Sequence, residues 1–163
     1  MQEATNSTVL GDFNDATFTH EGVASTFSRE GDAFRMRTVD AHGASSEFRI
    51  THTFGVDPLQ QYLVSFPDGR MQVLPVAWDS RPRDAGGQRW LSLEDPAVSA
   101  GQHWTTGLSH TWNSQCATCH STGVQKHFDL DTRRYDTPCA DLDVACEECH
   151  GPASNHVTRP DHP

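Results

Sequence analysis

Hydrophobic and polar residues alternate with a period of two over most of the first half of the chain. Successive side chains of a β-strand point to opposite faces of the sheet, so this alternation predicts strands that are buried on one face. In one of these segments Phe48, Ile50, His52 and Phe54 share a face. Strands are predicted for residues 23–28, 34–38, 48–54, 60–66 and 70–78.

Short clusters of Gly, Asp and Pro separate these segments and predict tight turns at residues 30–32, 40–43 and 67–69. Pro67-Asp68-Gly69 in particular is typical of a hairpin. Pro75 has no N–H to donate, so the strand over residues 70–78 is expected to be an edge or a bulged strand. Residues 1–95 are therefore predicted to form an antiparallel β-rich region.

The second half of the chain carries two related motifs, Cys116-Ala117-Thr118-Cys119-His120 and Cys146-Glu147-Glu148-Cys149-His150. Cys-x-x-Cys-His is the attachment signature of c-type haem. The two thiols add to the porphyrin vinyl groups, and the imidazole that follows becomes the proximal ligand of the iron. The motifs predict two covalently bound haem c groups, with His120 and His150 as iron ligands.

The same four cysteines leave a zinc site open as an alternative, because two Cys-x-x-Cys pairs can hold one structural zinc ion. The pairs begin at Cys116 and Cys146, which is a wider separation than the usual spacing of about 15–20 residues. Each pair is also followed by a His, which favours haem. Cys139 is the fifth cysteine and lies outside both motifs, so it is expected to be a small buried hydrophobe.

Around these motifs the chain lacks long periodicity, with short helical possibilities at residues 113–120 and 142–149. Only 35% of the 163 residues are hydrophobic, and the mean hydropathy is −0.62, so porphyrins are expected to supply part of the core. The expected fold class is α+β. It combines the N-terminal antiparallel β region with a mostly coil and short-helix multihaem cytochrome c module over residues 96–163.

The distal haem ligands are harder to predict than the proximal ones. His52 is a candidate, although a core His that hydrogen-bonds to backbone would give the same pattern. His156 follows the second motif too closely to reach its own iron easily, but it could bind a neighbouring haem. His103 and His110 are further candidates. The loop arginines Arg81, Arg83 and Arg89 either pair with haem propionates or are solvated charges.

A formal net charge of −10 disfavours contact with nucleic acid and anionic membranes, and it suits basic redox partners or simply solubility. No segment approaches the roughly 20 apolar residues of a transmembrane helix. Haem attachment to this motif normally takes place outside the cytoplasm, so a periplasmic or otherwise exported protein is expected. The first residues are not a signal peptide, so the chain is expected to be a fragment, a mature form or a mis-started reading frame.

A set of segments extends this interpretation: residues 55–63, 66–70, 77–82, 86–90, 112–113, 116–122 and 146–152. Together they resemble the multihaem c-type cytochromes in which a haem module precedes tetratricopeptide repeats. The resemblance implies a larger exported protein with at least three haems. Its further haem motif would lie upstream and its helical repeats downstream of this chain. It also favours His156 as a haem ligand.

Electron transfer through two covalent haems is the leading functional hypothesis, so the chain is expected to be an electron carrier rather than a catalyst. A haem-dependent redox enzyme for a small nitrogen or sulfur compound is the first alternative, and it would need an iron with an open coordination position. A zinc-bound structural module is the second. No Walker loop, dinucleotide-binding glycine pattern or Ser/His/Asp arrangement supports a nucleotide enzyme or a hydrolase.

Overall fold

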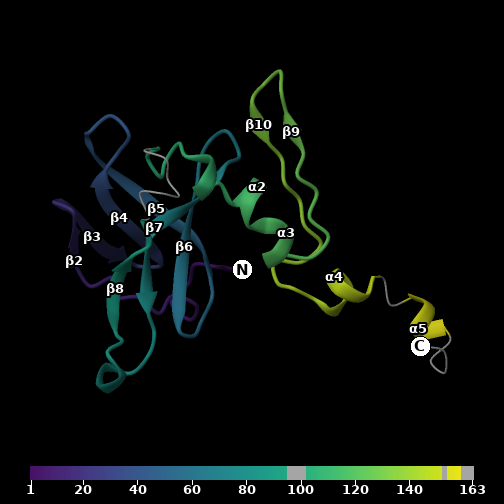
Figure 1. The fold of residues 1–163 in the computed structure, drawn as a ribbon, viewed down its shortest axis with the longest axis horizontal. Coiled ribbons are helices and arrows are strands. Elements are labelled where there is room, and N and C mark those ends of the chain that lie inside the picture. Colours follow the sequence, from purple (N-terminus) through teal and green to yellow (C-terminus); the bar gives the residue numbers. More distant parts are fainter. Residues whose placement is uncertain (95–101, 152–153, 159–163) are drawn as a thin grey trace.

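An eight-stranded antiparallel sheet is the main feature of the structure (Figure 1). The computed structural model describes residues 1–94, 102–151 and 154–158, with the backbone alone at positions 155 and 156. Seven strands follow one another in chain order along the sheet, and each pairs with the next. They are β2 (Ala16–His20), β3 (Val23–Glu30), β4 (Ala33–Val39), β5 (Ser45–Phe54), β6 (Leu59–Ser65), β7 (Met71–Asp79) and β8 (Arg89–Ser92).

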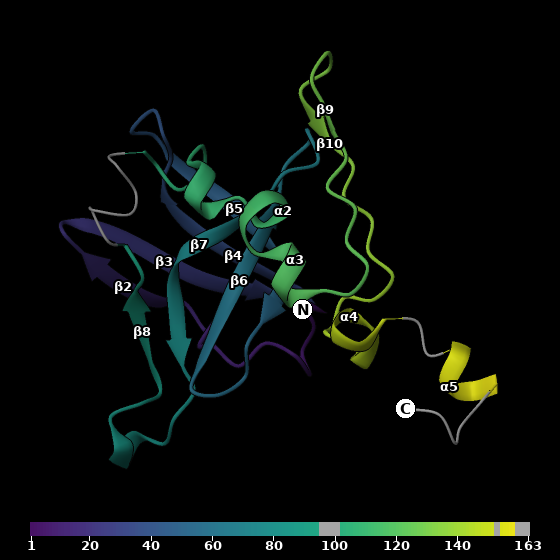
Figure 2. The ribbon, with the colours of Figure 1, turned by 45° about the vertical axis from the view of Figure 1, so that its right-hand side comes forward.

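The sheet curls into a nearly closed barrel, as Figures 1 and 2 show from two sides. β2 and β8 are the two ends of the strand path, and a short strand β1 (Gln2–Glu3) pairs separately with β5. The pairing shifts register within β5–β6 and within β6–β7. The second shift lies opposite Pro75, so the expected irregularity is present, and it occurs within an internal strand.

Aromatic side chains fill the inside of the barrel. Phe13 lies at its centre and meets the rings of Phe27, Phe34, Tyr62 and Trp90 edge-on, at centroid distances of 5.2 to 5.7 Å. The Phe27 ring from β3 stacks on the Trp90 ring from β8 at 3.7 Å. The two sides of the open seam are therefore joined by packing in the core.

Buried polar groups hold the N-terminal segment against this core. The amide side chain of Gln60 accepts a hydrogen bond from the Leu10 N–H and donates one to the Thr8 carbonyl, both at 2.8 Å. The Tyr62 hydroxyl accepts a bond from the Gly11 N–H at 3.0 Å, and burial raises the pKa of that phenol. A side chain at position 11 would collide with the Tyr62 hydroxyl, which explains the glycine.

The rest of the described chain lies against one side of the barrel or extends away from it (Figure 2). Its helices are single turns: η1 (Arg83–Ala85), η2 (Leu108–His110), α2 (Trp112–Gln115), α3 (Ala117–His120), α4 (Cys146–His150) and α5 (Ser154–Thr158). A small hairpin of β9 (Phe128–Asp129) and β10 (Arg134–Tyr135) projects between the two motifs. Among the described residues, no helix is long and apolar enough to span a membrane.

The expected α+β class, with a mostly coil and short-helix cytochrome module after the β region, is wrong. The chain is mostly β, with about 15% helix. The sheet extends to Ser92, and Trp104 belongs to the core of the barrel. The tryptophans of the middle segment pack against strands, so that segment completes the β structure. The five strands predicted from the alternating pattern correspond to β3 to β7.

Candidate functional site

The first Cys-x-x-Cys-His motif forms one tight helical turn. The N–H groups of Cys119 and His120 both donate to the Cys116 carbonyl at 3.1 Å, which brings the two thiols onto the same turn of backbone. Cys119 and His120 are exposed, and Cys116 is half-buried. Burial, with a smaller contribution from the nearby Cys119, raises the pKa of the Cys116 thiol. The turn therefore exposes the Cys119 thiol and His120, while Cys116 packs partly against the barrel.

Hydrophobic packing attaches this turn to the outside of the barrel. Trp112 and Ala117, from α2 and α3, join Phe54, Leu63 and Val73 from strands β5, β6 and β7 in a second buried cluster. Because side chains alternate along a strand, Leu63 faces this cluster while Tyr62 and Val64 face the barrel interior. The β-sheet thus has apolar residues on both faces where it carries the motif.

Asn113 is the polar anchor of the same segment and is only 2% exposed. Its side-chain oxygen accepts a hydrogen bond from the Met71 N–H at 2.8 Å. Its side-chain NH₂ donates to the Gly69 carbonyl at 3.2 Å and to the Thr137 hydroxyl at 3.0 Å. One side chain therefore joins the β6–β7 turn, the helix before the motif and the segment that follows the β9–β10 hairpin.

The His120 ring lies against two aromatic rings. Its centroid is 5.5 Å from that of Phe54, in an edge-on arrangement, and 5.7 Å from that of Trp112. Phe54 and Trp112 also contact each other at 4.9 Å. The imidazole is thus supported on the barrel side, while the residue remains exposed toward solvent.

The second motif forms the turn α4, where Cys146, Cys149 and His150 are all exposed. Thr122 holds the segment that leads into it: its hydroxyl donates to the Asp143 carbonyl and accepts from the Ala145 N–H, both at 2.7 Å. The Glu148 carboxylate accepts a bond from the Gly123 N–H at 2.8 Å. The start of the second motif is therefore fixed to the residues that follow the first.

The donor groups of both turns fit haem c better than a shared zinc ion. Within the described ranges, no three His, Cys, Asp or Glu side chains converge on a point where a metal ion could bind. Each turn instead carries two thiols and one imidazole, which is the donor set that haem c requires, and of these six groups only Cys116 is half-buried. At the first motif Cys116, Cys119 and His120 would hold the group, and at the second Cys146, Cys149 and His150. Bound haem supplies an iron that accepts and releases one electron.

His52, a predicted distal ligand, lies behind the first motif. It lines a cavity of about 100 Å³ together with the buried face of α3, at Ala117 and Ser121, but with none of the motif's thiols or His120. Its Nδ1 is 3.1 Å from the Thr51 hydroxyl, and burial lowers the pKa of the imidazole despite the opposing effect of Glu3. The structure thus brings His52 close to the motif but on the inner side of the turn.

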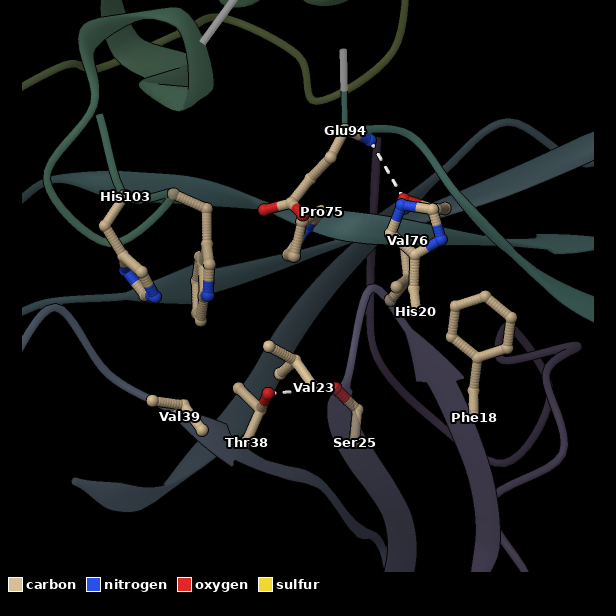
Figure 3. Close-up of a pocket in the computed structure, with 12 residues that line it drawn as sticks. Phe18, His20, Val23, Ser25, Thr38, Val39, Pro75, Val76, Glu94 and His103 are labelled. Atoms are coloured by element: carbon tan, nitrogen blue, oxygen red, sulfur yellow. Dashed lines mark hydrogen bonds between the residues drawn. The ribbon is translucent and has the colours of Figure 1, made fainter. Parts of the chain in front are cut away.

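Two further histidines line a cavity at the barrel seam. His103 and His20 lie on either side of Glu94 in a hollow of about 150 Å³, with Trp104 in its wall (Figure 3). The Nδ1 of His103 is 2.9 Å from the Thr105 hydroxyl. No cysteine of either motif lines this cavity. The other predicted candidate, His110, does not line this cavity. Burial lowers the pKa of its imidazole, and the charge of Glu94 partly opposes that effect.

The remaining predicted residues have other surroundings. His156 lies in α5, and its side chain is outside the described part of the structure. The Arg81 guanidinium binds the Asp79 carboxylate through two hydrogen bonds, at 2.9 and 2.6 Å. Asn113, Phe54 and Thr122 have no counterpart among the predicted site residues. In the sequence, the Trp112-Asn113 pair lies two residues before the first motif, and this position was the local feature from which Asn113 could have been proposed.

Comparison with known proteins identifies the segment that carries both motifs. Residues 78–151 match the family described as cytochrome c554 and c-prime. The match covers a little less than half of the chain and supports a c-type cytochrome family for this segment. No curated protein and no solved structure matches the chain. The match supports a c-type cytochrome, a kind of protein that binds haem c covalently and carries electrons between redox partners.

The matched segment of this cytochrome begins at Trp78, in strand β7, and ends just after His150. It therefore contains β8, the anchor Asn113 and both Cys-x-x-Cys-His turns. The rest of the barrel lies outside the match, although its strand β5 supplies Phe54 to the first motif.

Proposed function

We propose that this cytochrome carries electrons through two haem c groups, one bound by Cys116, Cys119 and His120 and the other by Cys146, Cys149 and His150. The observation that carries the proposal is the equivalent form of the two turns. In each, a single helical turn presents both thiols and the imidazole together, and each turn has its own attachment to the fold. A chain with two haems can pass an electron from one iron to the other and then to a partner.

The proposal includes the surroundings of the protein. We place it in the periplasm or otherwise outside the cytoplasm, where haem is attached to this motif. We also infer that it works with the further haem and helical-repeat segments that its resemblance implies. Its acidic charge favours a redox partner with a basic surface. His156 and His52 remain our proposed distal ligands, with His156 serving a neighbouring haem.

Haem counting tests the proposal directly. The chain is produced with an export signal in a host that has the haem attachment machinery, and its intact mass and pyridine haemochrome spectrum are recorded. Two haems per chain are expected. Replacing Cys116 and Cys119 by Ala should remove one, and replacing Cys146 and Cys149 should remove the other. Cys139→Ala is the matched control and should leave both. A colourless product that binds one zinc ion would overturn the proposal.

Carbon monoxide distinguishes a carrier from an enzyme. Six-coordinate haems leave no place for the gas, so the spectrum of the reduced carrier should not change when it is added. A ready shift of the Soret band would indicate an open iron. That result would favour the alternative of a redox enzyme acting on a small nitrogen or sulfur compound.

A further inference from the structure

The proximal histidine of the first haem site lacks the hydrogen bond that usually orients such a ligand. Metal-binding histidines nearly always donate their second ring N–H to a carboxylate, a backbone carbonyl or water, and that bond fixes the plane of the ring. Among the residues that the structure describes, neither ring nitrogen of His120 has a partner. The contacts that the described part of the protein offers this imidazole are therefore ring contacts.

Two rings make these contacts. Phe54 and Trp112 each lie within 6 Å of the His120 ring, at interplanar angles of 64° and 46°, and so restrict it from two directions. Edge-on packing, as of Phe54 on His120, is a favoured geometry of aromatic pairs. We call Phe54 and Trp112 the aromatic clamp.

Both members of the aromatic clamp are themselves held firmly. Phe54 is 9% exposed and pairs with Gln61 in the sheet, and Trp112 is 2% exposed at the start of α2. They touch each other at 4.9 Å and share the second buried cluster with Leu63 and Val73. Because both rings are fixed in this cluster, their contacts restrict where the His120 imidazole can lie relative to the barrel.

We infer that Phe54 and Trp112 are positioning residues that set the orientation of the His120 imidazole and, through it, the potential of the first haem. The inference rests on the proposed function, since it requires haem at Cys116 and Cys119. The ring plane controls how the ligand orbitals overlap with the iron, and burial around the ligand disfavours the ferric charge. Both effects are lost when a flat ring is replaced by a flexible aliphatic chain.

The second haem site provides an internal reference. In the described part of the chain no aromatic ring contacts His150, so its haem should not respond to changes in the clamp. The test compares Phe54→Leu and Trp112→Leu with the unchanged protein, in the haem-loaded form. Reductive titration followed in the visible spectrum gives both potentials, and electron paramagnetic resonance gives the low-spin signal of each haem.

The clamp predicts that only one of the two redox transitions moves. It should move to lower potential, because a looser site admits water beside the iron, and its resonance signal should broaden. Phe54→Tyr keeps the ring and should restore both properties. Phe48→Leu is the matched control, because Phe48 lies on the same strand but packs against Trp104 at 4.9 Å, and it should change neither transition.

The outcomes separate this inference from the proposed function. If the unchanged protein has a mass that lacks the first haem, the haem assignment itself is refuted. A protein with both haems but unchanged potentials and signals in Phe54→Leu would refute the clamp alone. If Trp112→Leu does not fold, as circular dichroism would reveal, Phe54→Leu and Phe54→Tyr still decide the question.

Discussion

Replacing Asn113 by Ala should destabilise the protein more than most single changes outside the hydrophobic core. The side chain is 2% exposed and makes three hydrogen bonds, at 2.8, 3.2 and 3.0 Å. A hydrogen bond in a folded protein contributes about 0.5–1.5 kcal/mol net, so three give roughly 2–4 kcal/mol. The change also leaves the Met71 N–H and the Gly69 carbonyl without these partners, which places the expected loss toward the upper end.

Urea denaturation followed by far-ultraviolet circular dichroism measures this loss, because it detects the sheet and is insensitive to haem quenching of tryptophan fluorescence. Asn14→Ala is the matched control: Asn14 is exposed, and its side chain bonds only to Asp12. It should change stability by less than about 0.5 kcal/mol. If Asn113→Ala costs less than about 1 kcal/mol, the three bonds do not anchor the motif as we argue.

Three further predictions concern other contacts. Gly69→Ala should lower the free energy of unfolding by about 1–3 kcal/mol, because the residue has φ +81° and a Cβ there would lie 2.0 Å from the Tyr135 carbonyl oxygen. Thermal unfolding measures this loss of stability. An unchanged melting temperature would contradict the prediction. Thr122→Val keeps the shape of the side chain but removes two hydrogen bonds, so hydrogen exchange at the Ala145 amide should accelerate while exchange in the barrel stays slow. The hydrogen bond and charge of Arg81 lower the pKa of Asp79 below its ordinary value of 3.8. The pair therefore stabilises the folded state at pH values above 3.8. This stabilisation is lost as the pH falls through the lowered pKa of Asp79 in the folded protein. Denaturation midpoints measured from about pH 5 to pH 3 should fall less steeply in Asp79→Asn than in the unchanged protein.

The strands of the first half could be predicted because their signal is local. Alternation at Phe48 and Ile50 follows directly from the pleat of a β-strand, and the Pro67-Asp68-Gly69 turn has its own backbone preference. The prediction that Phe54 shares their face is wrong, because the register shift after Ile50 turns Phe54 to the outer cluster. The candidate haem-binding residues could be proposed for a similar reason, since each motif lies within five consecutive positions. Both depend on the order of neighbouring residues alone.

The relation between the barrel and the motif depends on contacts between residues far apart in the chain. Trp104 and Trp112 read as irregular segments in the sequence, yet one fills the barrel and the other covers its outer face. Asn113 reaches residues 44 and 24 positions away. The expectation of a separate coil and short-helix module failed at this point, because nothing local reveals that a sheet supports the segment. His52 illustrates the same difficulty: it was predicted to share a face with Phe48 and Ile50, but the register shift after Ile50 turns it to the outer face, beside α3.

Thr122 also bears on the rate of electron transfer between the two proposed haems. Tunnelling between two cofactors weakens steeply with every ångström that separates them. The same residue pairs with Asp141 through its backbone and holds Asp143 and Ala145 through its hydroxyl. Thr122 therefore ties the segment before the second motif to the residues just after the first, so with both proposed haems bound it would help to fix the distance between their attachment turns.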